Sequence, residues 1–178
     1  MGMVTADLGI SLDGFIAGPR QSLEKPMGEG AEDLHRWMFE QPEENASEIA
    51  AIVDAGAFIM GRNMFGPIRG EWSGDWRGWW GEEPPYHAPV FVLTHYPREP
   101  LVMEGGTTFN FVTDGVASAL EQARAAAGDA SISVGGGADT IRQFLRAGLL
   151  DELRLHTAPI LLGGGERIFD DVGDLTFE

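Results

Sequence analysis

The sequence predicts an α/β domain of three layers, in which helices cover both faces of a mixed, mostly parallel central sheet. Short apolar segments such as residues 57–60 and 89–93 indicate strands that are buried on both faces, as in parallel sheets. Segments with apolar residues at helical spacing alternate with these strands, which is typical of α/β folds. There is no internal repeat, low-complexity tract or linker, so we expect a single domain over residues 1–178.

Composition narrows the class of protein further. The 12 Lys and Arg residues against 28 Asp and Glu residues give a formal net charge of −16, which argues against nucleic acid and anionic membranes as partners. Because there is no cysteine, disulfides, thiolate zinc sites and thiol nucleophiles are excluded. The chain shows neither a signal-peptide pattern nor an apolar run of membrane-spanning length, so we expect a soluble cytoplasmic protein.

The N-terminal half predicts strands, helices and an aromatic segment. Residues 3–10 form the first strand, with Asp7 on the face opposite the apolar residues, and Asp13-Gly14 marks a turn after it. The next elements are a helix over 31–40, a helix that starts with a capping box at Asn45 and buries Ile49, Ile52 and Val53, and a strand over 57–60. Residues 71–86 contain four of the five tryptophans. This segment is either a loop anchored on the core, or a cover over an apolar ligand or a subunit contact.

The C-terminal half continues the alternation. Its expected elements are strands over 89–93, 108–112, 132–134 and 153–157, a helix over 115–127, and a helix from the triple glycine to Gly148. On the last of these strands, Arg154 and His156 face the side opposite Leu153 and Leu155. Residues 166–172 indicate a short turn or strand, and Leu175 and Phe177 alternate as at the start of one further strand.

Three short signals lie at the carboxyl ends of predicted strands. Gly61-Arg62, Thr94 and Gly135–Gly137 each follow directly on a strand, and in an open α/β sheet such ends form one crevice where ligands bind. The glycine turn suits a phosphate at the start of a helix. A tight turn with Asp139 as the helix cap explains it equally well, because the third glycine of the dinucleotide fingerprint is absent.

Several motifs, in this order, resemble the dihydrofolate-reductase-like family. They are Ser11-Leu12-Asp13-Gly14, Met60-Gly61-Arg62, Val92-Leu93-Thr94-His95, the glycine turn, Gly148-Leu149-Leu150-Asp151-Glu152-Leu153 and Pro159-Ile160-Leu161-Leu162-Gly163-Gly164-Gly165. They are most similar to the branch with the reductase domain of the bifunctional riboflavin-biosynthesis deaminase-reductase. The resemblance spans nearly the whole chain and implies a mixed eight-stranded sheet. The deaminase half is absent, and we expect the closing C-terminal hairpin of the fold to be missing or replaced.

The resemblance also implies an NADPH site in the crevice. Its cofactor residues would be Gly61, Arg62, Asn63, Met64, Thr94, His95, Gly135, Gly136, Gly137, Ala138, Asp139 and Thr140. Arg62 would meet the 2′-phosphate or the pyrophosphate, and the glycines with the amides that open the next helix would hold the pyrophosphate. The implied substrate pocket contains Leu8, Phe15, Ile16, Trp37 and Trp72, and the implied catalytic carboxylate is Asp33 or Asp13.

The expected activity is hydride transfer from NADPH to a C=N or C=O bond of a small pterin-, aminopyrimidine- or sugar-linked substrate. Two alternatives stay open: a non-catalytic nucleotide-binding or dimerisation module of the same fold, and a true dihydrofolate reductase. A metal hydrolase is disfavoured and no metal is expected, because His35, His87, His95 and His156 are scattered without ligand spacing. The resemblance and the aromatic segment together predict a homodimer.

Overall fold

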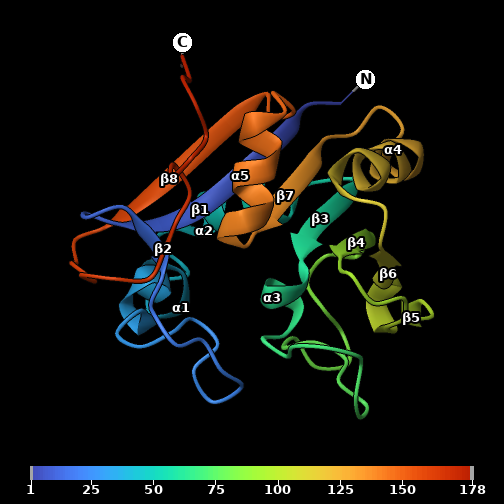
Figure 1. Ribbon diagram of the computed structural model, residues 1–178, viewed down its shortest axis with the longest axis horizontal. Coiled ribbons are helices and arrows are strands. Elements are labelled where there is room, and N and C mark those ends of the chain that lie inside the picture. Colours follow the sequence, from blue (N-terminus) through green and yellow to red (C-terminus); the bar gives the residue numbers. More distant parts are fainter. Residues whose placement is uncertain (1, 177–178) are drawn as a thin grey trace.

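The fold is built on a seven-stranded sheet with the strand order β5-β6-β4-β3-β7-β1-β8, seen in a computed structural model that describes residues 2–176 (Figure 1). Neighbouring strands run parallel except β5, which is antiparallel to β6. Strands β2 and β9 form a separate two-stranded antiparallel sheet. The predicted α/β class and the mixed, mostly parallel sheet are therefore confirmed, whereas the main sheet has seven strands among residues 2–176 and not the eight that the resemblance implies.

The predicted strands and helices occur in the predicted order along the chain. The strands are β1 (Val4–Ser11), β2 (Phe15–Ala17), β3 (Ala57–Gly61), β4 (Pro89–Leu93), β5 (Leu101–Val102), β6 (Thr108–Val112), β7 (Ile132–Gly136), β8 (Glu152–Ala158) and β9 (Glu166–Arg167). The helices are η1 (Glu32–His35), α1 (Arg36–Phe39), α2 (Ala46–Val53), α3 (Arg62–Phe65), η2 (Glu104–Gly106), α4 (Val116–Ala127) and α5 (Ala138–Arg146).

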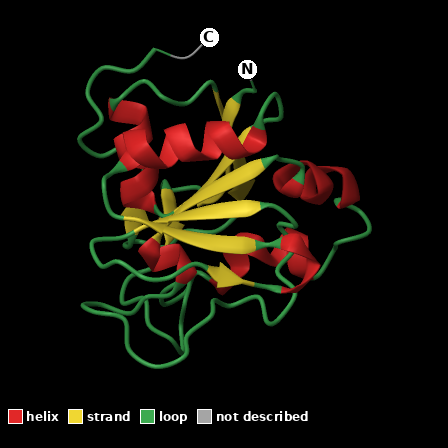
Figure 2. Ribbon diagram, turned by 90° about the vertical axis from the view of Figure 1, so that its right-hand side faces the viewer, coloured by secondary structure: helices red, strands yellow, loops and turns green. Residues whose placement is uncertain are grey.

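Helices lie on both sides of the strands, as Figure 2 shows. Helices α4 and α5 cover one face, where Leu8 and Ile10 of β1 belong to the same buried cluster as Ile141 and Phe144 of α5. The other face is covered in two parts. Helix η1 packs on β1 and β8, whereas β3, β4 and β6 are covered by the tryptophan segment around Phe65.

Strand β1 lies in the interior of the sheet between β7 and β8. Its parallel register pairs Asp7 with Arg154 and Gly9 with His156. Since paired residues on neighbouring strands point to the same face, this register brings a carboxylate, a guanidinium and an imidazole together beneath η1.

Two predicted helices differ from the observed ones. The helix expected over 31–40 is divided into η1 and α1, because the backbone at His35 leaves the helical region (φ −112°, ψ 15°). The predicted capping box of α2 is wrong: the Asn45 side chain donates to the carbonyls of Trp37 and Gln41 rather than accepting from helical amides. No residue of α2 is buried, so the predicted burial of Ile49, Ile52 and Val53 is also wrong.

The C-terminal part of the sheet leaves one edge open. Among residues 2–176, β8 has no strand partner on its outer side, where Leu153, Leu155 and Phe169 line a groove of about 670 Å³. The further strand expected at Leu175 and Phe177 is not confirmed, since Leu175 lies in no strand and Phe177 is outside the described residues. No helix within residues 2–176 combines the length and the apolar character needed to cross a membrane.

Candidate functional site

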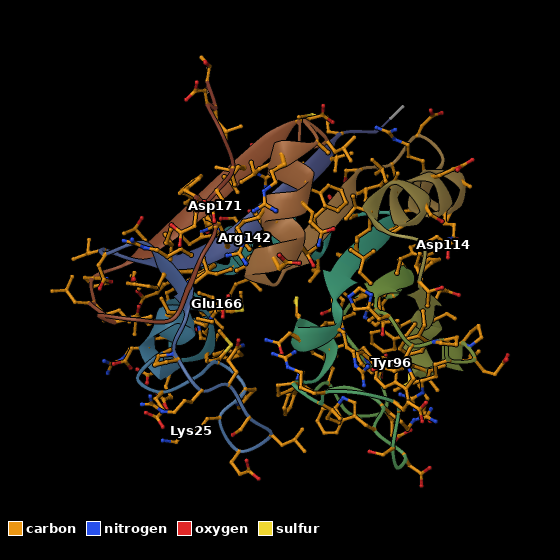
Figure 3. The ribbon with its side chains drawn as sticks, viewed as in Figure 1. Lys25, Tyr96, Asp114, Arg142, Glu166 and Asp171 are labelled. Atoms are coloured by element: carbon orange, nitrogen blue, oxygen red, sulfur yellow. The ribbon has the colours of Figure 1, made fainter. Side chains whose placement is uncertain are left out.

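A cavity of about 900 Å³ opens at the carboxyl ends of the parallel strands. Its lining residues come from two groups of elements, one on each side, with β1, β2, η1, α1 and β9 in the first and β3, α3, β4, β6, β7 and α5 in the second. Figure 1 shows how β1, β2 and α1 lie apart from β3, α3, β4 and β6. Figure 3 places Glu166 on the first side and Tyr96 on the second. A hydrogen bond of 2.8 Å from Asn63 Nδ2 to Gln21 Oε1 joins the two sides.

The second side carries the positive charge of the cavity, and we call it the arginine end, defined by Arg62, Arg69 and the β7–α5 glycine turn. Arg62 opens α3 directly after β3, and its guanidinium lies 3.9 Å above the ring of Trp72. Its Nη1 donates to the carbonyl of Gly70, whereas Nε and Nη2 are buried without a hydrogen-bond partner. Burial lowers the pKa of Arg62, Tyr96 opposes this shift, and Arg69 and Arg98 add to it. An arginine keeps its positive charge despite such a shift. Two N–H donors of a cation are therefore buried without an acceptor, and an anion would satisfy them.

The glycine turn between β7 and α5 lines the same cavity as Arg62. Gly136 has φ +118°, a conformation that glycine adopts without strain, and the bond between Gly136 and Gly137 is cis. No side chain caps the start of α5, because the Asp139 carboxylate instead accepts from Gln143 at 2.7 Å and pairs with Arg142. The prediction that Asp139 caps this helix is therefore wrong. The first backbone N–H groups of α5 have no side-chain acceptor.

Helices α3 and α5 start in close contact. A Cβ added at Gly61 would lie 2.5 Å from Thr140 Oγ1, which is shorter than a van der Waals contact. Only glycine at the end of β3 therefore lets Arg62 approach the start of α5.

The first side of the cavity, defined by Asp7, His35 and Glu166, is called the aspartate end. The Asp7 side chain is only 3% exposed, and its Oδ1 lies 3.3 Å from both Arg154 Nη1 and His156 Nε2. The imidazole of His156 stacks on the indole of Trp37, with ring centroids 4.8 Å apart. Burial, with His156 adding to it, lowers the pKa of His35, which favours the neutral imidazole.

The structure brings nearly all of the predicted cofactor residues to one cavity. Eleven of the twelve line it: Gly61, Arg62, Asn63, Met64, Thr94, His95, Gly135, Gly137, Ala138, Asp139 and Thr140. Gly136 lies between two of them without lining the cavity itself. The three strand ends meet because β3, β4 and β7 run parallel in adjacent positions.

Of the predicted substrate-pocket residues, Leu8 and Ile16 line the cavity. Phe15, Trp37 and Trp72 do not line it. The ring of Phe15 packs under Arg167, Trp37 lies behind the cavity wall on His156, and Trp72 supports Arg62.

The two predicted catalytic carboxylates lie outside the cavity. Asp33 is exposed on η1, on the outer side of the helix from Leu34. Asp13 accepts hydrogen bonds from the Ser11 hydroxyl at 2.6 Å, the Gly163 amide at 2.7 Å and the Leu162 amide at 3.1 Å. The Ser11 hydroxyl, with these two amides, lowers the pKa of Asp13 to about 2 against the opposing effect of burial. Asp13 thus anchors the loop of the second triple glycine.

The tryptophan segment is anchored on the core through its indole N–H groups. Trp72, Trp76 and Trp79 donate to the backbone carbonyls of Tyr96, Phe65 and Met64 at 2.8–2.9 Å. Trp79 and Trp80 also line the arginine end of the cavity. The segment is thus an anchored loop that lines the arginine end of the cavity rather than the aspartate end.

Sequence reasoning missed Asp7, His35 and His156 as site residues. A usable signal was present, because Asp7 stands within an otherwise apolar strand and charged groups are almost never buried unless paired. Arg154 and His156 alternate on one face of another strand and are suitable partners. Within residues 2–176, no three His, Asp or Glu side chains are grouped so as to hold a metal ion.

The chain is similar to several known proteins. A solved structure of a putative riboflavin biosynthesis protein from Shewanella sp. PV-4 is 26% identical, with a TM-score of 0.62 over 97% of this chain and 86% of that one. Dihydrofolate reductase from Enterococcus faecalis, solved with NADP(H), is 16% identical, covers 94% of this chain and 77% of that one, and shares the fold with a TM-score of 0.52. The uncharacterized protein YyaP of Bacillus subtilis (strain 168) is 24% identical over 173 residues, which is 95% of this chain and 81% of that protein.

The family comparison agrees with these likenesses. The sequence model of the RibD C-terminal domain family matches residues 2–178, nearly the whole chain, so the predicted resemblance is confirmed. The chain belongs to the RibD C-terminal domain family.

Proposed function

We propose that the protein is an NADPH-dependent reductase that transfers a hydride to a C=N or C=O bond of a small substrate. The observation that carries the proposal is Arg62, whose Nε and Nη2 are buried at the cavity without a partner. Buried charged donors are costly unless an anion satisfies them. The related reductase from Enterococcus faecalis was solved with NADP(H), which carries such an anion.

The residues at the arginine end fit this cofactor. Arg62 would hold the 2′-phosphate with its two free donors, and the rings of Trp72 and Tyr96 keep the guanidinium in place. The uncapped amides at the start of α5 would bind the pyrophosphate, where Gly135 and Gly137 allow close approach. Thr94 and His95 would lie beside the adenosine.

The rest of the cavity would position the substrate. NADPH, when bound, supplies the hydride. Leu8, Ile16 and Phe39 line the wall with apolar surface, which excludes water and suits a flat ring. The Asn63–Gln21 hydrogen bond holds the two sides of the cavity together around the ligands.

Titration of the purified protein with NADPH and NADH, followed by nicotinamide fluorescence, tests the proposal. We expect saturable binding that favours NADPH. The variant Arg62→Ala should weaken NADPH binding by about 10- to 100-fold, since hydrogen bonds to charged groups contribute about 1.5–3 kcal/mol. NADH binding should change far less, because NADH has no 2′-phosphate. Equal weakening of both cofactors would remove Arg62 from this role, and no binding of either would contradict the proposed function.

We also keep the predicted homodimer as a proposal, now on a different surface. The tryptophans are engaged in the core, whereas Leu155 and Phe169 are 38% and 42% exposed beside the open edge of β8. An open edge strand with apolar neighbours favours association with another strand. Light scattering at micromolar concentration should give twice the monomer mass, and Leu155→Lys should lower it. A monomeric wild type would contradict the proposal. The cytoplasmic location likewise stays a prediction from composition.

A further inference from the structure

The cations that line the cavity all lie at one of its ends, where the exposed carboxylate of Asp139 is paired with Arg142. These lining cations are Arg62 and Arg69, both at the arginine end. The aspartate end has the carboxylates of Asp7 and Glu166 and the imidazole of His35, and no Lys or Arg of the described residues lines it. A substrate that binds beside the cofactor therefore meets a negative surface.

Three cations on the segments around the aspartate end are paired with carboxylates. Arg154 binds Glu152 at 2.8 Å and Asp7 at 3.3 Å. Arg20 pairs with Glu29, and Arg36 pairs with Glu40 on the surface. None of the three lines the cavity, so none is placed to neutralise an anionic substrate there.

Asp7 keeps one oxygen for a ligand. Both of its contacts, from Arg154 Nη1 and His156 Nε2, end on Oδ1, and Oδ2 has no hydrogen-bond partner among the described residues. The partners of Oδ1 are themselves held, since His156 stacks on Trp37 and Arg154 is bound by Glu152. The carboxylate is thus a fixed acceptor at the cavity wall.

His35 adds a polar group without a positive charge. A Cβ at Gly9 would lie only 3.1 Å from His35 Nε2, so the glycine leaves room for the imidazole of His35, which lines the cavity as Asp7 does. Desolvation and the neighbouring His156 both favour its neutral form. The aspartate end therefore offers a carboxylate acceptor and a neutral imidazole to the substrate.

We propose that the aspartate end selects a neutral or cationic planar substrate, which donates N–H hydrogen bonds to Asp7 Oδ2 and carries no phosphate. This inference rests on the proposed function, because the arginine end must be taken by the cofactor for the substrate to meet only the aspartate end. An N–H edge satisfies the free carboxylate oxygen. A phosphate in the same place would face Asp7 and Glu166 without a lining cation.

The test uses the protein saturated with NADPH and three probes: 2,4-diaminopyrimidine, which is rich in N–H donors, and the matched pair cytidine and cytidine 5′-monophosphate. Binding is followed by calorimetry. We expect Asp7→Asn to weaken 2,4-diaminopyrimidine by about tenfold or more, since a charge-assisted hydrogen bond becomes a neutral one. Asp174→Asn, a matched change at an exposed carboxylate far along the chain, should leave its affinity within about twofold. Cytidine should bind at least about tenfold more tightly than its monophosphate.

The outcomes separate the two proposals. Unchanged diaminopyrimidine affinity in Asp7→Asn, no binding of that probe to the wild type, or a monophosphate that binds as well as cytidine would each overturn the inference. If Asp7→Asn does not fold, the matched pair on the wild type still decides it. Failure of NADPH to bind would contradict the proposed function instead, and the diaminopyrimidine titration without cofactor would still test the role of Asp7.

Discussion

The two ends of the cavity are assembled in different ways. The arginine end is made of short consecutive stretches, in which Gly61-Arg62 and Gly135–Gly137 come directly after buried strands. The aspartate end takes one side chain each from β1, η1 and β9, with support from β8. One end depends on backbone conformation at strand ends, whereas the other depends on long-range register. Changes at the two ends should therefore have separable effects.

The largest expected effect comes from the contact between α3 and α5 at the arginine end. Gly61→Val would place a branched side chain where even a Cβ lies 2.5 Å from Thr140 Oγ1. We expect a loss of about 1–3 kcal/mol in stability from overpacking, together with loss of NADPH binding as Arg62 moves away from α5. Thermal unfolding and cofactor titration measure the two effects. Gly164→Ala is the control, because its Cβ meets nothing within 4 Å. A Gly61→Val protein that binds NADPH normally would show that the two helix starts are independent.

A smaller effect, on stability alone, is expected at Asp13. Its pKa is about 2 in the folded protein and returns to the ordinary 3.8 on unfolding. Its contribution is therefore complete above about pH 4 and is lost as the pH falls towards 2. The difference in unfolding temperature between wild type and Asp13→Asn should shrink over that range. A difference that does not vary with pH would show that Asp13 stabilises the loop without its charge.

The smallest effect is expected at Asp33. Comparing it with Asp7 tests directly which carboxylate binds the substrate. Because Asp33 is exposed and lies outside the cavity, Asp33→Asn should change diaminopyrimidine affinity by less than about twofold. Asp7→Asn measured in parallel should show the larger loss. If Asp33→Asn weakened diaminopyrimidine binding more than Asp7→Asn, the carboxylate that binds the substrate would be Asp33, one of the two that the family resemblance implied.

These cases show what the sequence could predict and why the rest needed the fold. Strand ends followed by glycine are local patterns, so Arg62 and the β7–α5 turn could be assigned to one crevice before the structure was known. Asp7 and His156 are 149 residues apart, and only the parallel β1–β8 register brings them together. Local patterns also misled: Asn45 has the residue type of a helix cap, but its amide bonds the preceding turn, which competes for the same side chain. The spacing of the tryptophans likewise left an anchored loop and a ligand cover or subunit contact open, and it did not indicate which end of the cavity the segment would line.

The position of β1 has a consequence for how the chain is made. Its neighbours in the sheet begin at Ile132 and Glu152, so β1 leaves the ribosome long before either of the two strands that flank it. Meanwhile β3, β4 and β6 can pair with one another, since they lie between residues 57 and 112. The arginine side of the sheet can therefore form during synthesis, whereas the aspartate side can form only after β7 and β8 have been made. Until then the Val4–Ile10 segment lacks its two neighbouring strands and exposes its apolar side chains.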